Sequence, residues 1–94
     1  MEGMMANLRI LSLKGLAVLP EGTIKVDRGS DWGNPFVMHG EQDRDRVCEL
    51  FAQYAQWRLS VDPEWLKPLR GKHLACWCAP KRCHAETLRR LANE

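Results

Sequence analysis

A chain of 94 residues is long enough for one domain and lies near the lower size limit for a chain that buries its own core. Its 45% hydrophobic and 28% charged residues argue against intrinsic disorder, and the apolar stretch at residues 8–20 is too short to span a bilayer. The net charge of +2 is uneven, because residues 70–94 hold six basic and two acidic side chains; this basic end suits phosphate or nucleic acid, and equally a solvated helix face.

The first apolar stretch, residues 8–20, looks like a signal segment at first glance. Arg9 and Lys14 interrupt it and no small-residue cleavage site follows, so we expect a soluble, cytoplasmic protein without membrane contact. Within this stretch, residues 8–13 are predicted to form a strand that ends at Gly15. Four cysteines in a reducing compartment favour metal binding, thiol chemistry or packing over disulfides.

A second strand is predicted over residues 23–27, where apolar and polar side chains alternate. Turn-forming residues then fill 29–35, and residues 42–60 show the three-and-four apolar spacing of an amphipathic helix. Asp62-Pro63 is predicted to open a short helix that Pro68 and Gly71 close.

Side chains over residues 72–78 are predicted to alternate between the two faces of a third strand, with Leu74, Cys76 and Cys78 on one face. Residues 83–92 have the pattern of a final helix. Strands connected through helices pair in parallel with right-handed crossovers. The sequence therefore predicts an α/β fold: one domain, residues 1–94, forming a small sandwich with a three-stranded or larger, partly parallel sheet and helices packed on it.

Ligands of parallel sheets bind beyond the carboxyl ends of the strands. Because strands 23–27 and 72–78 should run in the same direction, the segments that follow them should meet at one rim of the sheet. The first segment supplies predicted ligand-binding residues Arg28, Asp31, Trp32 and Asn34. The second supplies Lys81 and Arg82 for ligand binding, and Cys78, Cys83 and His84 as candidate catalytic residues.

Two motifs at this rim carry a resemblance to a known family. Arg-Gly-Ser-Asp-Trp-Gly-Asn-Pro-Phe at residues 28–36, followed by the stretch from Gly71 to His84 with its Cys-Trp-Cys and Cys-His pairs, resembles domain-of-unknown-function family 4326 of bacteria and phages. The resemblance covers roughly residues 23–93. The strand followed by a Cys-His helix start is also similar to family 488. Neither resemblance implies an established activity.

The cysteine cluster has three readings. Cys76, Cys78, Cys83 and His84 contain the ligand types of a Cys₃His zinc site, although adjacent Cys83 and His84 do not have the usual ligand spacing. Alternatively, Cys83 is a reactive thiol whose pKa a helix N-terminus and neighbouring cations lower, with His84 as base or donor. The third reading is packing, which suits Cys76 and also Cys48 within the long helix.

The Trp-Gly-Asn-Pro turn is open to two interpretations. Gly33 permits a positive φ or a close backbone approach, so the turn can be a rigid plug for the core. If the turn binds a ligand, Trp32 stacks on a ring, Asn34 reads a polar edge and Arg28 holds a phosphate. Trp57 and Trp65 are predicted to lie in the core.

Together these patterns favour a small domain that binds a nucleotide or nucleic-acid-related ligand at a Cys/His-rich rim, with processing of that ligand as an open option. The alternative is a zinc-stabilised protein-interaction module without catalysis, for example a phage-encoded modulator of a host protein. The sequence specifies neither a reaction nor an oligomeric state.

Overall fold

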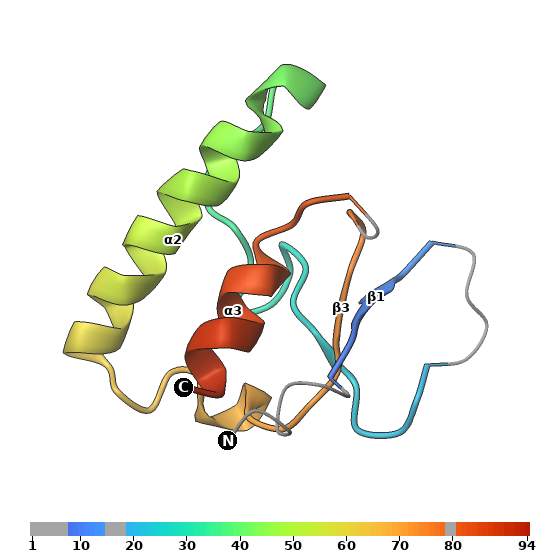
Figure 1. Cartoon of the computed structure of the whole chain (residues 1–94), viewed down its shortest axis with the longest axis vertical. Helices are drawn as coiled ribbons and strands as arrows, with labels where there is room; N and C mark the ends of the chain where they lie inside the picture. The colour runs from blue at the N-terminus through green and yellow to red at the C-terminus, as the bar shows by residue number, and fades with distance from the viewer. Residues whose placement is uncertain (1–7, 15–18, 79–80) are drawn as a thin grey trace.

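The fold is built on a small, fully parallel sheet. The computed structural model describes residues 8–14, 19–78 and 81–94. Its strands are β1 (Ile10–Ser12), β2 (Ile24–Lys25) and β3 (Leu74–Cys76), in the order β1-β3-β2. Figure 1 shows β3 and β1 side by side. The predicted α/β class and the common direction of the second and third strands are confirmed; the predicted strand end at Gly15 lies outside the described residues.

The register places the central strand between two partners. Leu74 on β3 is level with Ile10 on β1 and Ile24 on β2. All three β3 residues are buried, which agrees with a strand covered on both faces. Backbone hydrogen bonds extend this pairing beyond β2, because the Val26 N–H donates to the Ala75 carbonyl at 2.9 Å.

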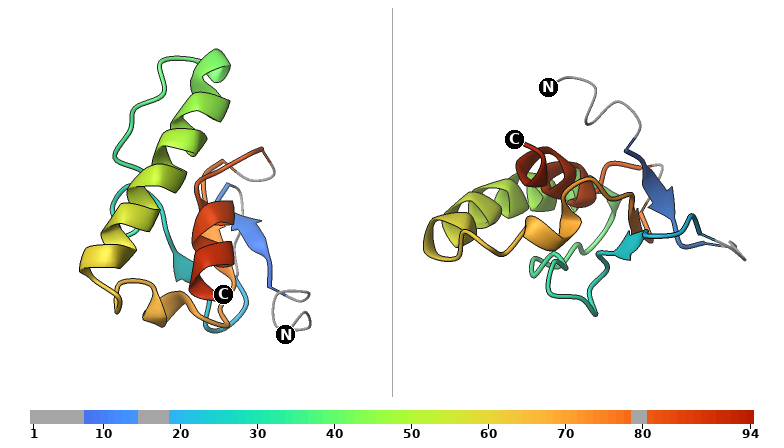
Figure 2. Two further views of the ribbon diagram at one scale, coloured as in Figure 1. Left: turned by 60° about the vertical axis from the view of Figure 1, so that its left-hand side comes forward. Right: turned by 90° about the horizontal axis from the view of Figure 1, so that it is seen from below.

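Two α-helices complete the domain. The 3₁₀ turn η1 (Glu41–Asp43) leads into α2 (Arg44–Val61), and the chain ends with α3 (Ala85–Ala92). Helix α3 contacts both β3 and α2, an arrangement visible in Figures 1 and 2. In the part of the chain that the structure describes, no helix is long and apolar enough to cross a membrane.

The short helix expected after Asp62-Pro63 is a series of turns that ends in the 3₁₀ helix η2 (Lys67–Leu69). Pro68 has no N–H to donate and disfavours the α conformation at Lys67 before it, so an α-helix does not develop.

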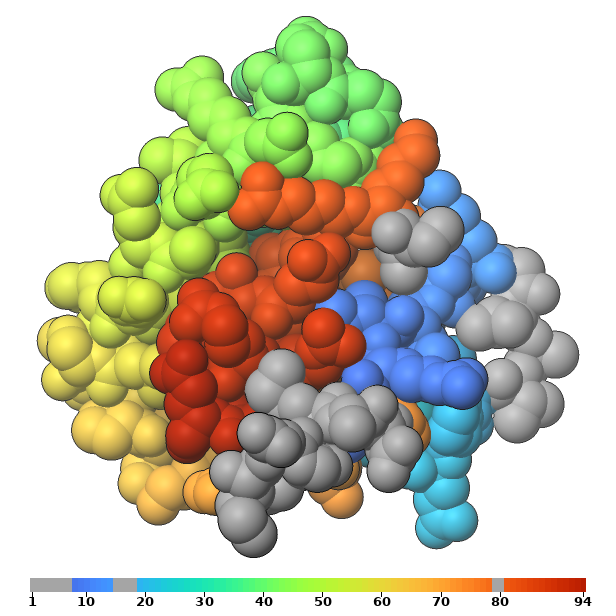
Figure 3. Space-filling model, viewed as in Figure 1, coloured from blue at the N-terminus to red at the C-terminus, as the bar shows by residue number. Residues whose placement is uncertain are grey.

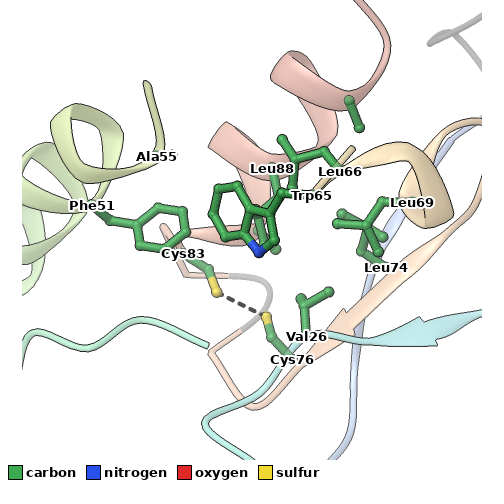
Figure 4. Close-up of a cluster of buried hydrophobic side chains, with 12 residues drawn as sticks. Val26, Phe51, Ala55, Trp65, Leu66, Leu69, Leu74, Cys76, Cys83 and Leu88 are labelled. Carbon is green, nitrogen blue, oxygen red and sulfur yellow. Dashed lines mark hydrogen bonds between the residues drawn. The ribbon is translucent and has the colours of Figure 1, made fainter. Parts of the chain in front are cut away.

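The hydrophobic core lies between α2, α3 and the sheet, as Figure 4 shows with Phe51, Leu88, Leu74 and Val26. Trp65 belongs to this core, as predicted. Trp57 does not: its side chain is 60% exposed on α2. Helical periodicity alone placed it in the core, whereas the buried face of α2 is occupied by Val47, Cys48, Phe51 and Ala55.

Candidate functional site

The segments that follow β2 and β3 meet around one pocket. A cavity of about 390 Å³ opens where these strands end. Its described lining comes from both segments and from the start of α2: Asp27, Arg28, Gly29, Asn34, Phe36, Met38, Arg44, Val47, Cys48, Cys76, Trp77, Cys78, Arg82, Cys83 and His84. The predicted juxtaposition of the two motifs at one rim is therefore confirmed.

His84 joins the two segments directly. Its Nε2 lies 2.7 Å from the carbonyl oxygen of Val26, just past β2. A carbonyl only accepts, so Nε2 carries the proton and donates it. Burial lowers the pKa of His84, which keeps the imidazole neutral, and Phe51 packs edge-on against the ring at 5.0 Å. The lone pair on Nδ1 then faces the Cys83 sulfur at 3.3 Å.

Cys83 is a buried thiol rather than an activated one. Its sulfur lies 3.0 Å from the sulfur of Cys76, the contact drawn as a dashed line in Figure 4. The hydrogen bond to Cys76, together with burial, raises the pKa of Cys83 far above its ordinary value. The predicted lowering of this pKa is wrong, because the side chain points into the core, where these effects exceed the lowering by the backbone hydrogen bond at Ala85.

The predicted zinc ligands are not grouped as a metal site in the described part of the chain. Across residues 8–14, 19–78 and 81–94, no group of three or more His, Cys, Asp or Glu side chains is arranged to hold an ion. One nitrogen of His84 lies against the Val26 carbonyl at 2.7 Å and the other against the Cys83 sulfur at 3.3 Å. Closed zinc sites need four converging ligands.

Cys78 differs from the other cysteines of the pocket. Its side chain is half-buried, whereas Cys48, Cys76 and Cys83 are buried. The guanidinium of Arg44 forms hydrogen bonds with Glu41 and with Cys78. Both bonds raise the pKa of Arg44, the bond with Glu41 more strongly. Cys78 is therefore an accessible thiol beside a permanent cation.

The two cations predicted to bind a ligand are largely neutralised by α2 and η1. Arg82 pairs with Asp45 at 3.1 Å and Glu49 at 2.9 Å, and Lys81 pairs with Glu41 at 3.3 Å. Figure 3 shows this orange segment after β3 lying across the green first turns of α2. Arg82 lines the pocket, whereas Lys81 is absent from its described lining. These ion pairs fasten the segment to α2.

In the other segment, most polar groups of the Trp-Gly-Asn-Pro turn bond within the protein. Arg28 donates to the carbonyls of Asn34 at 3.0 Å and Phe36 at 3.2 Å. The Asn34 side chain donates to the Val47 carbonyl at 3.3 Å and accepts from the Phe36 N–H at 2.9 Å. Arg28 and Asn34 still line the pocket, so both shape its wall.

Trp32 and Asp31 lie outside the described lining of the pocket. The indole N–H of Trp32 donates to the Trp65 carbonyl at 3.0 Å, and the Trp65 indole donates to the Asp31 carbonyl at 3.2 Å. This reciprocal pair holds the turn to the core. The proposed stacking role of Trp32 is therefore not supported by its position.

Several pocket residues were missed by the sequence reasoning, chiefly Asp27, Arg44 and Trp77. Trp77 is 53% exposed at the rim, and its indole N–H lies 3.3 Å from the Asp27 carboxylate. A sequence signal for Trp77 existed, because a tryptophan between two cysteines directly follows a buried strand. Arg44 carried no such signal, since only the tertiary fold places the first turn of α2 over Cys78.

This geometry defines the class of protein: a small parallel α/β domain with a cysteine-lined pocket at the carboxyl ends of its strands. The chain belongs to the family described as a domain of unknown function (DUF4326), which matches residues 11–94 and so begins earlier than expected. It is 33% identical over 73 residues to the "Uncharacterized 12.4 kDa protein in nrdA-td intergenic region" of Enterobacteria phage T4. The matched stretch covers 74% of this chain and 67% of the phage protein. No solved structure matches this chain. The similarity to family 488 stays a prediction.

Proposed function

We propose that the pocket binds a nucleotide or a nucleic-acid-related ligand, and that Cys78 is the thiol available to react with it. The observation that carries the proposal is the cavity of about 390 Å³ at the carboxyl ends of β2 and β3. Its size falls within the range of small-molecule sites, and its position is the one where parallel sheets collect ligands.

The chemistry of the rim supports this ligand class. Trp77 offers a half-exposed aromatic surface on which a base can stack. Arg28 lines the same pocket and, among the described ion pairs, has no carboxylate partner, so its charge suits a phosphate. The Asp27 carboxylate can accept hydrogen bonds from sugar hydroxyls.

A reactive role for the site falls to Cys78 rather than to the Cys83–His84 pair. Cys83 keeps its proton because its pKa is raised, and His84 stays neutral because its pKa is lowered. A thiolate–imidazolium pair therefore does not form between them. Cys78 combines partial exposure with the neighbouring Arg44 guanidinium.

Titration calorimetry with a panel of purine and pyrimidine nucleoside mono- and diphosphates tests the binding proposal. Trp77→Ala should weaken binding about 5- to 150-fold, because base–aromatic stacking contributes about 1–3 kcal/mol. Trp57→Ala is the matched control, since this tryptophan is equally exposed on α2 but is not a lining residue. Absence of heat with every nucleotide, or equal loss in both variants, contradicts the proposal.

A time course of iodoacetamide labelling, read by peptide mass spectrometry, tests the role of Cys78. Cys78 should be labelled first, because it is the most accessible of the four thiols. Cys78→Ser should remove the fast phase, whereas Cys48→Ser should preserve it. Labelling of Cys83 at the same rate as Cys78 contradicts this assignment.

A further inference from the structure

All four cysteines of the chain line the same pocket, although they come from three different segments. Cys48 comes from α2, Cys76 from the last position of β3, and Cys78 and Cys83 from the segment that leads to α3. Nucleotide binding does not require four thiols. Their convergence needs a separate explanation.

Two of these thiols are already in contact. The sulfurs of Cys76 and Cys83 lie 3.0 Å apart. A disulfide needs about 2.05 Å between the sulfurs, so closure of about 1 Å would join them. Of the residues between them, the described ones (Trp77, Cys78, Lys81 and Arg82) lie in neither a helix nor a strand, so no regular hydrogen-bond ladder holds these four.

We infer that Cys76 and Cys83 are a reversible dithiol–disulfide pair, oxidised by a small peroxide that enters the pocket. This site goes beyond the proposed ligand binding and does not depend on it. Each of the two cysteines is 3% exposed or less, yet both line the cavity of about 390 Å³. Hydrogen peroxide is small enough to reach them through this cavity, whereas a protein oxidant is not.

The chemistry balances with hydrogen peroxide as the two-electron oxidant. One of the two thiols first loses its proton, and the thiolate sulfur attacks a peroxide oxygen; the O–O bond breaks, the hydroxide that leaves takes up a proton to become water, and a sulfenic acid remains. The second thiol then attacks this sulfur, the S–O bond breaks, and a second water leaves as the S–S bond forms. Two thiols are oxidised and one peroxide is reduced to two waters.

Oxidation would also change the neighbouring histidine. The Cys83 sulfur now lies 3.3 Å from Nδ1 of His84, where the imidazole presents its lone pair. In the disulfide Cys83 carries no proton, so it can donate neither to the Cys76 sulfur nor to this buried nitrogen. His84 also donates a hydrogen bond to the Val26 carbonyl. Oxidation of the sulfurs would therefore act on a side chain that contacts both segments of the pocket, the one after β3 and the one after β2.

Peptide mapping of the full chain after peroxide treatment tests the inference. The protein is treated with hydrogen peroxide, quenched with catalase, blocked with N-ethylmaleimide and digested with trypsin. Two of the four thiols should be lost, and the peptide 73–81 should be linked to the peptide 83–89, with fragment ions that place the bond at Cys76. Dithiothreitol should restore both thiols.

Variants sharpen the assignment. Cys78→Ser and Cys48→Ser should keep the link, whereas Cys76→Ser should abolish it. Because removal of a buried thiol can impair folding, the fragment ions of the unsubstituted protein decide the outcome alone. A bond from Cys83 to Cys78, a bond between two chains, or oxidation of the thiols without any link would overturn the inference.

Discussion

The two segments that form the pocket use their polar residues in opposite ways. In residues 28–36, Arg28, Asn34 and Trp32 direct their hydrogen bonds to backbone groups of the protein itself. In residues 77–84, the surface cations pair with acids of α2 and η1, while the sulfurs of Cys78 and Cys83 remain at the cavity. The first segment therefore mainly builds the wall, with Arg28 bringing its charge to the pocket, and the second supplies the thiols.

The difference shows why a conspicuous motif is not always a binding motif. Trp-Gly-Asn-Pro was as unusual in sequence as Cys-Trp-Cys, yet its side-chain donors and acceptors bond to part-buried backbone groups of the protein itself. Substitutions in the first segment should accordingly cost stability, and substitutions in the second should mainly change reactivity or pH response.

The largest stability loss is expected from Gly33→Ala. A Cβ at this position would lie 2.7 Å from both the Arg28 Cα and the Asp27 carbonyl oxygen, so the backbone must shift, at a cost of about 3 kcal/mol. Gly29→Ala is the control in the same segment, because its Cβ would meet only the Asp27 side chain at 3.9 Å. Urea denaturation of both variants measures the difference, and equal stabilities would refute the close approach.

Asn34→Ala should cost about 2 kcal/mol in unfolding free energy, since it leaves the Val47 carbonyl and the Phe36 N–H without their side-chain partner. Asp31→Ala should change stability by less than about 0.5 kcal/mol, because its exposed side chain forms none of the described hydrogen bonds. Thermal unfolding compares the pair. A destabilised Asp31 variant with an unaffected Asn34 variant would reverse the assignment.

His84 should make stability depend on pH. Its pKa in the folded protein is lowered from the ordinary 6.5 by burial, so the unfolded chain binds more protons as the pH falls below that value. Stability is therefore retained above pH 6.5 and declines below it, by up to about 1.4 kcal/mol per pH unit.

The measurement is urea unfolding from about pH 7.5 to about pH 5.5, the window around the ordinary histidine pKa. His84→Gln should flatten the decline, because the glutamine amide can donate to the Val26 carbonyl without titrating. His39→Gln, at an exposed position, should leave it unchanged. An equally steep decline in His84→Gln would exclude this histidine as its cause.

The smallest effect is expected from Arg82→Ala. Its ion pairs with Asp45 and Glu49 join side chains that are 41–83% exposed, and such pairs contribute about 0.2–1 kcal/mol. A double-mutant cycle of Arg82→Ala and Glu49→Ala at low and high salt measures the coupling. A loss as large as that of Gly33→Ala would mean that the second segment also has a mainly structural role.

The fold and the position of the site could be predicted from the sequence, because alternation in residues 23–27 and 72–78 and the helices between and after them determine a parallel sheet. The chemistry of Cys83 could not. Its position before α3 suggested a lowered pKa, whereas its side-chain direction toward Cys76, which depends on tertiary packing, raises it. The core placement of Trp57 was wrong for the same reason, since helical periodicity does not show which turns of a helix extend beyond the core.

The central position of β3 affects how the two walls of the pocket move. Strand β3 pairs with β1 on one side and with β2 on the other, whereas β2 has two residues and, within the described sheet, pairs with β3 alone. Amide protons of β3 should therefore exchange with solvent last, and those near β2 earlier. A bound molecule would thus contact a stable wall at β3, which carries Cys76, and a more dynamic wall near β2. Slower amide exchange near β2 would then report that a ligand has bound.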